Sequence, residues 1–165
     1  MLRYFAHGPV RWKNGMRCNT RTNWEFYAVT SGRCGVKFTD RQRPRFREKT
    51  LWLFAPDCSH AWANHQQRHY ERVSLHFGTV PYPLDELVRQ NGGWLERPLS
   101  PGELTRIQAW ANELEPAFRR PTLISPLLFQ RRLLDLSLLM LEGREWDDAP
   151  LALTDLATFK TQRAV

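Results

Sequence analysis

The sequence predicts a mainly β fold with C-terminal helices, in which a small barrel occupies the first half of the chain. Three segments rich in aromatic and β-branched residues, within 24–32, 51–64 and 73–77, are separated by clusters of Gly, Pro, Asp and Asn. Such segments between turn residues are typical of barrel strands. After residue 83 the pattern becomes helical, so the composition changes near residue 80.

Length and charge limit the possibilities. The 165 residues and 19.5 kDa fit one domain, or one domain with an appendage. A net charge of +7 favours acidic partners. The densest basic run, 41–47, has Arg at every second position, which is typical of the solvated face of a hairpin. Phe46 is its one aromatic residue, whereas a nucleic-acid surface usually interleaves several.

The cysteines and the N-terminus indicate the compartment. Cys18, Cys34 and Cys58 form no C-x-x-C pair, as expected for reduced thiols. The first 17 residues lack the apolar core of a signal peptide, and no apolar run is long enough to cross a bilayer. We expect a soluble, cytoplasmic protein without membrane contact.

Two helices are expected after the barrel. The first begins at Ser100-Pro101-Gly102-Glu103, which has a capping serine, a proline in the first turn and a glutamate three residues on. Its apolar residues recur every three or four positions, and Pro116 is expected to kink or shorten its end. The second helix starts at Ser125-Pro126, and Gly143 closes it.

The second helix carries more leucine than one buried face requires. One stripe can pack on the barrel, and an exposed second stripe usually means a partner helix. We expect a homodimer through one stripe, and the sequence does not decide which of them faces the barrel. The candidates are Leu134, Leu138 and Leu141, or Leu133, Leu136 and Met140.

Strand alternation sorts the remaining polar residues into faces. On 70–77 one face is polar, whereas the other is apolar from Val73 onward and suits packing against the helices. We assign the polar face to the barrel interior. The residues that share a face within their strands are Glu25, Tyr27, Val29 and Ser31; His60 and Trp62; and Tyr70, Arg72, Ser74 and His76.

Two short motifs resemble those of the cupin superfamily. Glu25 lies seven residues before Gly32, and His60 follows a Pro-Asp turn and precedes Asn64 by four. In the cupin pattern this Glu points into a jelly-roll barrel, so the face of Glu25 would line the interior. The resemblance implies that the interior holds a ligand or a metal.

The predicted interior contains eight candidate ligand-binding residues. Unpaired buried polar groups cost about 1–3 kcal/mol each, so these groups should be satisfied by one another or by a ligand. Rings combined with several polar groups suit a small polar ligand. The alternatives are a self-satisfied network or solvent-facing strands in another register. The candidates are Glu25, Tyr27, Ser31, His60, Trp62, Arg72, Ser74 and His76.

The ligands of a cupin metal site are only partly present. Cupin enzymes use two His in an H-x-H, the Glu and a later His, and here only Glu25 and His60 match. The positions near Cys18 and Thr20, where the H-x-H would fall, hold no His. Because a catalytic centre needs about three protein ligands, we expect no metal, no cofactor and no catalytic residues.

The order of elements is similar to the N-terminal sensor domain of AraC-type transcription regulators. The segment 53–62, with the strand ending at Phe77, looks like the signature region of that family, and the resemblance covers roughly residues 20–143. It implies an effector-binding barrel, a leucine-rich dimerisation helix and an N-terminal arm that can fold over the effector. The arm would include Tyr4, Phe5, His7 and Trp12, and the alternative is that these residues begin the first barrel strand.

The resemblance also bears on individual residues. Sugar contacts in an arabinose-binding member map to Trp62, Arg72 and Ser74. Two glycines of the family pattern are replaced here, one by Lys49 and one by Asp57, and Asp tolerates turn conformations.

The predicted organisation has three parts: a cupin-like effector-binding barrel with its arm over 1–83, a helical dimerisation segment over 84–143, and a linker over 144–165. The linker would lead to a helix-turn-helix domain that is absent from the sequence and would make the only DNA contacts. We predict a small-molecule sensor rather than an enzyme, with a homodimer as its assembly. A sugar is one candidate effector because of Trp62 and the hydroxyls, while Arg72 also suits a carboxylate. The alternatives are a small metal-dependent cupin isomerase or dioxygenase, or a purely structural dimerisation module.

Overall fold

The computed structural model describes residues 1–10, 17–65 and 69–142. The linker predicted for 144–165 and Trp12 of the predicted arm lie outside them. The strands are β1 (Leu2–Val10), β2 (Trp24–Ser31), β3 (Cys34–Lys37), β4 (Arg45–Arg47), β5 (Thr50–Phe54), β6 (Ala61–Asn64), β7 (Tyr70–Phe77) and β8 (Trp94–Pro98). The helices are α1 (Leu84–Gln90), α2 (Pro101–Arg119) and α3 (Ser125–Leu141).

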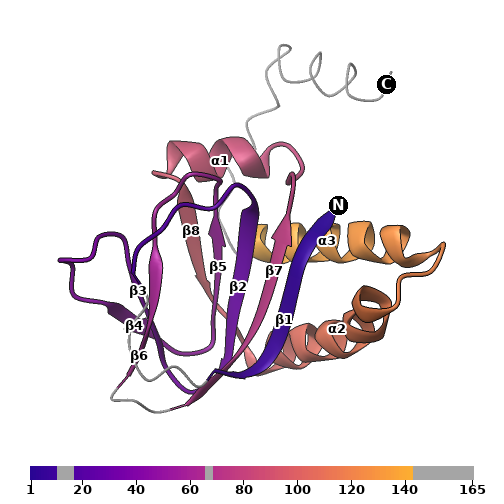
Figure 1. Ribbon diagram of the computed structural model, residues 1–165, viewed down its shortest axis with the longest axis horizontal. Coiled ribbons are helices and arrows are strands. Elements are labelled where there is room, and N and C mark those ends of the chain that lie inside the picture. Colours follow the sequence, from indigo (N-terminus) through magenta and orange to yellow (C-terminus); the bar gives the residue numbers. More distant parts are fainter. Residues whose placement is uncertain (11–16, 66–68, 143–165) are drawn as a thin grey trace.

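The strands lie in two antiparallel sheets. One sheet has the order β1-β7-β2-β5-β8, and the other has the order β4-β3-β6. Figure 1 shows three layers, with the small sheet on one side of the large sheet and α2 and α3 on the other. The described strands therefore form two facing sheets rather than the closed barrel expected from the sequence. The coarser prediction, a β-rich domain followed by helices, is confirmed.

A strand interrupts the region predicted to be helical. β8 pairs with β5 from Thr50 opposite Pro98 to Phe54 opposite Trp94, and it forms one edge of the large sheet. A proline is tolerated at the end of an edge strand because its missing N–H removes no ladder hydrogen bond. The segment 84–143 is thus helix, strand and two further helices, and only α2 and α3 match the two helices expected.

The N-terminal residues form a strand. β1 pairs with β7 along its whole length, from Leu2 opposite Phe77 to Val10 opposite Tyr70. Of the two possibilities for Tyr4 to His7, a free arm or a first strand, the structure has the strand.

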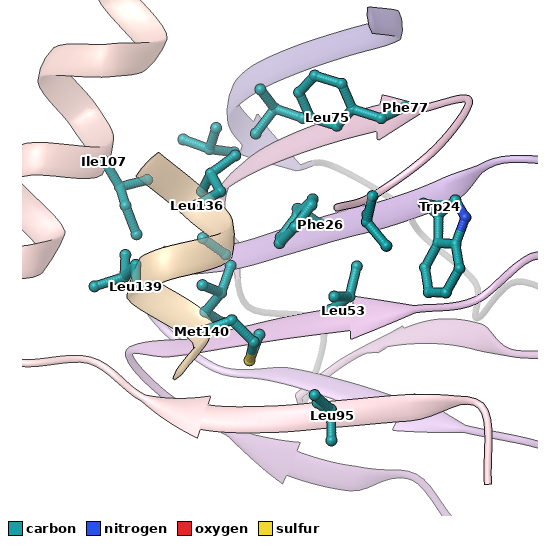
Figure 2. Close-up of a cluster of buried hydrophobic side chains, with 14 of the residues drawn as sticks. Trp24, Phe26, Leu53, Leu75, Phe77, Leu95, Ile107, Leu136, Leu139 and Met140 are labelled. Carbon is teal, nitrogen blue, oxygen red and sulfur yellow. The ribbon is translucent and has the colours of Figure 1, made fainter. Parts of the chain in front are cut away.

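The outer face of the large sheet packs against α2 and α3 (Figure 2). Burying one such apolar side chain stabilises the fold by about 1.5–3 kcal/mol. This core therefore attaches the two helices to the sheet. Its members include Phe26, Leu53 and Leu75 from the sheet, Ile107 from α2, and Leu136, Leu139 and Met140 from α3.

Helix α2 begins at the predicted cap. Ser100 Oγ accepts a hydrogen bond from the Glu103 backbone, and Glu103 accepts one from the Ser100 N–H at 2.6 Å, which completes a capping box. The helix runs three residues past Pro116 and ends at Arg119.

The two leucine stripes of α3 have different environments. Leu136 and Met140 are buried against the sheet, and Leu133 is partly buried beside them. Leu134 and Leu138 are 53% and 62% exposed, whereas Leu141 packs partly on the core. The stripe that contains Leu136 is therefore the one that faces the sheet.

Among the helices of the described residues, none is long and apolar enough to cross a bilayer.

A second core lies between the two sheets. It confirms the predicted alternation, because Tyr27 and Val29 point between the sheets while Phe26 and Ala28 pack beneath the helices. The members of this inner core are Val10, Tyr27, Val29, Cys34, Val36, Trp52, Phe54, Trp62 and Tyr70.

Lys49 and Asp57 keep the backbone conformation that glycine favours. Their φ angles are 45° and 65°, in the left-handed region. A side chain with a Cβ is strained there, and Asp is strained less than Lys.

Replacing Lys49 with glycine is expected to raise the free energy of unfolding by roughly 0.5–1 kcal/mol, because relief of the left-handed strain exceeds the added entropy of the unfolded chain. Urea denaturation measures the change. Glu48→Gly, one residue earlier, relieves no such strain and should lower stability by a similar amount. A loss of stability in Lys49→Gly would show that the turn is not strained.

Candidate ligand-binding site

A cavity of about 260 Å³ opens between the sheets. Six of the eight candidate residues line it, and His60 and Ser31 are the two that do not. The lining residues are Tyr4, Asn19, Arg21, Glu25, Tyr27, Trp62, Arg72, Ser74 and His76.

His60 lies in the wall behind Glu25. Its ring stacks on Phe54 with 3.9 Å between ring centres, and its Nδ1–H donates to the Cys58 carbonyl at 2.9 Å. Its Nε2 lies 3.2 Å from Glu25 Oε2. The ring therefore positions the carboxylate that faces the cavity.

Ser31 lies outside the cavity. The pairing of β2 with β7 is irregular between Val29 and Ser31, so the alternation predicted from the sequence breaks there. Ser31 is exposed at the end of its strand. An irregularity of this kind turns the following side chain away from its expected face.

Glu25 is the centre of a buried ionic cluster. It is 2% exposed, and Arg21 Nε donates to its Oε2 at 2.9 Å. Arg21 Nη1 lies 2.8 Å from His60 Nε2, and His76 Nε2 lies 3.6 Å from Glu25 Oε1. Burial raises the pKa of Glu25, but hydrogen bonds with both imidazoles and the charge of Arg21 outweigh burial and lower this pKa to about 2.

Acid is expected to destabilise the protein through Glu25. The folded pKa of about 2 lies below the ordinary 4.5, so this contribution is present above about pH 4.5 and is lost as the pH falls towards 2. At about 1.4 kcal/mol per pKa unit it amounts to roughly 3 kcal/mol. Urea denaturation across this range measures it. The double variant Arg21→Met/Glu25→Gln should lose less stability over the same range, and an equal loss would contradict the assignment to Glu25.

The cluster also bears on metal binding. The Arg21 guanidinium contacts both Glu25 and His60, the two residues that match cupin metal ligands. Within the described residues, no group of three or more His, Cys, Asp or Glu side chains is arranged to hold a metal ion. Glu25 and His60 already hold a cation, the guanidinium of Arg21, so the side chains at this position do not fit a metal.

Two side chains leave hydrogen-bond donors unused at the cavity. Arg72 Nε and Nη1 and Trp62 Nε1 are buried and have no hydrogen-bond partner among the described residues. The Arg72 guanidinium carbon lies 5.8 Å from the centre of the Tyr27 ring, a cation–π distance.

Aromatic rings form the rest of the wall. Tyr27 and Trp62 stack with 3.6 Å between ring centres, and the hydroxyls of Tyr27 and Tyr70 are 2.7 Å apart. Burial raises the pKa of Tyr27 well above its usual value, so the phenol stays neutral. Tyr4 of β1 packs on His76, with 4.7 Å between the ring centres.

Sequence reasoning missed Asn19 and Arg21 as cavity residues. Both precede β2, in a segment without periodicity, and Asn19 reaches the site by bridging to His60 through the backbone. No pattern in the sequence marks this bridge, because it joins residues 41 positions apart and forms only in the folded chain.

A larger cavity of about 540 Å³ lies at the turn between α2 and α3. Its lining combines four apolar residues with four polar ones, and none of these described residues has an unused buried donor: Pro116, Ala117, Ile124 and Leu128, and Arg119, Arg120, Thr122 and Ser125. The inter-sheet cavity is the stronger candidate because polar groups converge on it.

Comparisons with known proteins place the fold. No family model and no curated protein sequence matches the chain. The structure is similar to ligand-free ToxT from Vibrio cholerae strain SCE256, with 7% identity over 82% of this chain and 54% of that chain and a TM-score of 0.51. ToxT from V. cholerae O395 bound to (E)-4-(8-methylnaphthalen-1-yl)but-3-enoic acid also matches, with 8% identity over 83% of this chain and 55% of that chain and a TM-score of 0.48. The chain spans about half the length of these ToxT chains. At 7% identity, the likeness to ligand-free ToxT shows a shared fold.

Proposed function

We propose that this chain is the effector-sensing and dimerisation domain of an AraC-type transcription regulator. The inter-sheet cavity carries the proposal, because a neutralised ionic pair and unused donors converge on a space of small-molecule size. The fold, which is shared with the AraC-family regulator ToxT, supports the same function. DNA would be bound by a separate helix-turn-helix domain.

Binding is better supported than catalysis. A metal-dependent cupin enzyme would need Glu25 and His60 as ligands, and Arg21 contacts both of them. The remaining cavity residues offer hydrogen bonds and ring surfaces, which orient a ligand.

The exposed side of α3 supports dimerisation. Leu127, Leu134 and Leu138 are 66%, 53% and 62% exposed and recur at helical spacing, so they share one side of the helix. Antiparallel pairing with the same helix of a second copy is the simplest closed arrangement that covers them.

Strand β1 connects the cavity with the helices. Tyr4 lines the cavity. The next residue, Phe5, packs on Phe118 of α2 with 5.8 Å between the ring centres. His7 Nε2 lies 2.9 Å from Glu115 Oε2 of the same helix. A ligand that moves Tyr4 would therefore displace contacts on α2, which packs against the dimerisation helix α3.

The sensing role is tested by screening sugars and organic acids for thermal stabilisation. A ligand at 100 times its dissociation constant adds about 2.7 kcal/mol to stability. Ser74→Ala should weaken binding by roughly 0.5–1.5 kcal/mol, whereas Ser31→Ala should leave it unchanged because Ser31 lies outside the cavity. Equal effects of the two serine variants would place the ligand elsewhere.

The dimerisation role is tested by light scattering at micromolar concentration. The unmodified protein should be a dimer, and the double variant Leu134→Glu/Leu138→Glu should be a folded monomer. A monomeric unmodified protein would remove this role.

A further inference from the structure

The unused donors at the inter-sheet cavity identify a ligand class. We propose that the effector is a small organic monocarboxylate, whose carboxylate group is bound by Arg72 with the indole N–H of Trp62 as an additional donor. This inference rests on the proposed sensing function and names the chemistry of its ligand.

The charges that line the cavity leave one positive charge uncompensated. The charged lining residues are Arg21, Glu25 and Arg72. Arg21 and Glu25 neutralise each other through their contact at 2.9 Å. Glu71 precedes Arg72 on β7, and strand alternation places it on the opposite face. The cavity is thus complementary to a ligand with a single negative charge.

The hydrogen-bonding chemistry favours a carboxylate over a sugar hydroxyl at this position. Guanidinium and indole nitrogens only donate, so their partner must accept. A hydroxyl can accept but is neutral, whereas a carboxylate accepts several hydrogen bonds and forms stronger, charge-assisted ones. Arg72 Nε, Arg72 Nη1 and Trp62 Nε1 together present three such donors without partners among the described residues.

The cavity volume limits the size of the acid. A water molecule takes about 30 Å³ in the liquid. At that volume per non-hydrogen atom, the cavity of about 260 Å³ accommodates roughly nine such atoms. The part of a longer acid that exceeds this volume would extend out of the cavity, which is open to solvent. The rings of Tyr4, Tyr27 and Trp62 suit the apolar part of a short or aromatic acid.

Matched acids and amides test the proposal by thermal shift and calorimetry. The panel contains benzoate, phenylacetate, butyrate and lactate, the corresponding primary amides, neutral sugars and inorganic phosphate. At least one carboxylate should bind 100-fold more tightly than its amide. Arg72→Gln should reduce that affinity about 100-fold, whereas Arg41→Gln, which makes the same charge change at an exposed site, should not. An amide or phosphate that binds as tightly as the acid would overturn the proposal.

A second measurement needs no ligand. Buried donors without a partner destabilise the ligand-free protein, and Arg72 Nε and Nη1 are two such donors, so Arg72→Met should raise its melting temperature. A lower melting temperature would show that contacts such as the one with the Tyr27 ring outweigh the cost of the two unused donors, and the proposal would fail.

The outcomes separate this inference from the sensing function. Carboxylates are tested at roughly 10 mM, where even millimolar affinity is detected. If none of them binds, but a neutral sugar binds and Ser74→Ala weakens its binding, the sensing function remains and the carboxylate proposal is wrong. If neither class binds, both proposals fail.

Discussion

Replacing Arg21 with methionine is expected to lower the free energy of unfolding by roughly 3–5 kcal/mol, because it leaves the buried Glu25 carboxylate without its cation. Methionine keeps most of the side-chain stem, so the loss reports the charge rather than the packing. Chemical denaturation near neutral pH measures it.

Two further variants isolate the charge. Arg21→Met/Glu25→Gln removes both charges and should cost less than Arg21→Met alone, since no unpaired buried charge remains. Arg33→Met breaks the Arg33–Glu48 ion pair, in which both side chains are about half exposed. It should change stability by less than about 1 kcal/mol. Equal losses in Arg21→Met and Arg33→Met would show that burial does not strengthen the cluster.

Replacing Leu139 with alanine is expected to lower the free energy of unfolding by about 2–5 kcal/mol. Leu139 is 1% exposed and belongs to the apolar core that attaches α2 and α3 to the large sheet (Figure 2). The truncation removes apolar contacts and leaves a cavity that the surrounding residues fill only in part.

The adjacent Leu138 provides a matched control, because it has the same chemistry but is 62% exposed. In the background of Leu134→Glu, at a concentration where light scattering shows a monomer, Leu138→Ala should change stability by less than about 0.5 kcal/mol. Thermal and chemical denaturation of the two alanine variants compare them directly. If Leu138→Ala costs as much as Leu139→Ala there, α3 is rotated relative to its position in this structure.

Local patterns were sufficient for much of the fold. Alternation on β2 and β7 separated residues that face the cavity, such as Tyr27 and Ser74, from residues that face the helices, such as Phe26 and Leu75. The capping box at Ser100 located the start of α2. These predictions succeeded because side-chain direction and capping depend on residues that are close in the chain.

Other features depended on residues far apart in the chain. Strand β8 was missed because its five residues become a strand only when the edge of β5 offers hydrogen bonds to them. Ser31 was misplaced because the irregular pairing of β2 involves its partner β7. The partner of Glu25 went unrecognised because nothing near Arg21 marks it as a residue of the cavity.

By itself, the sequence determined the β-rich class, the two long helices and most of the residues that face the cavity, since each follows from periodicity within one segment. The tertiary structure alone decided that two facing sheets replace a closed barrel, and that the Leu136 stripe, rather than the Leu138 stripe, packs on the sheet. It also decided that a guanidinium lies beside Glu25 and that Arg72 Nε and Nη1 have no hydrogen-bond partner among the described residues. These outcomes depend on the free energy of contacts between distant segments, which no local pattern encodes.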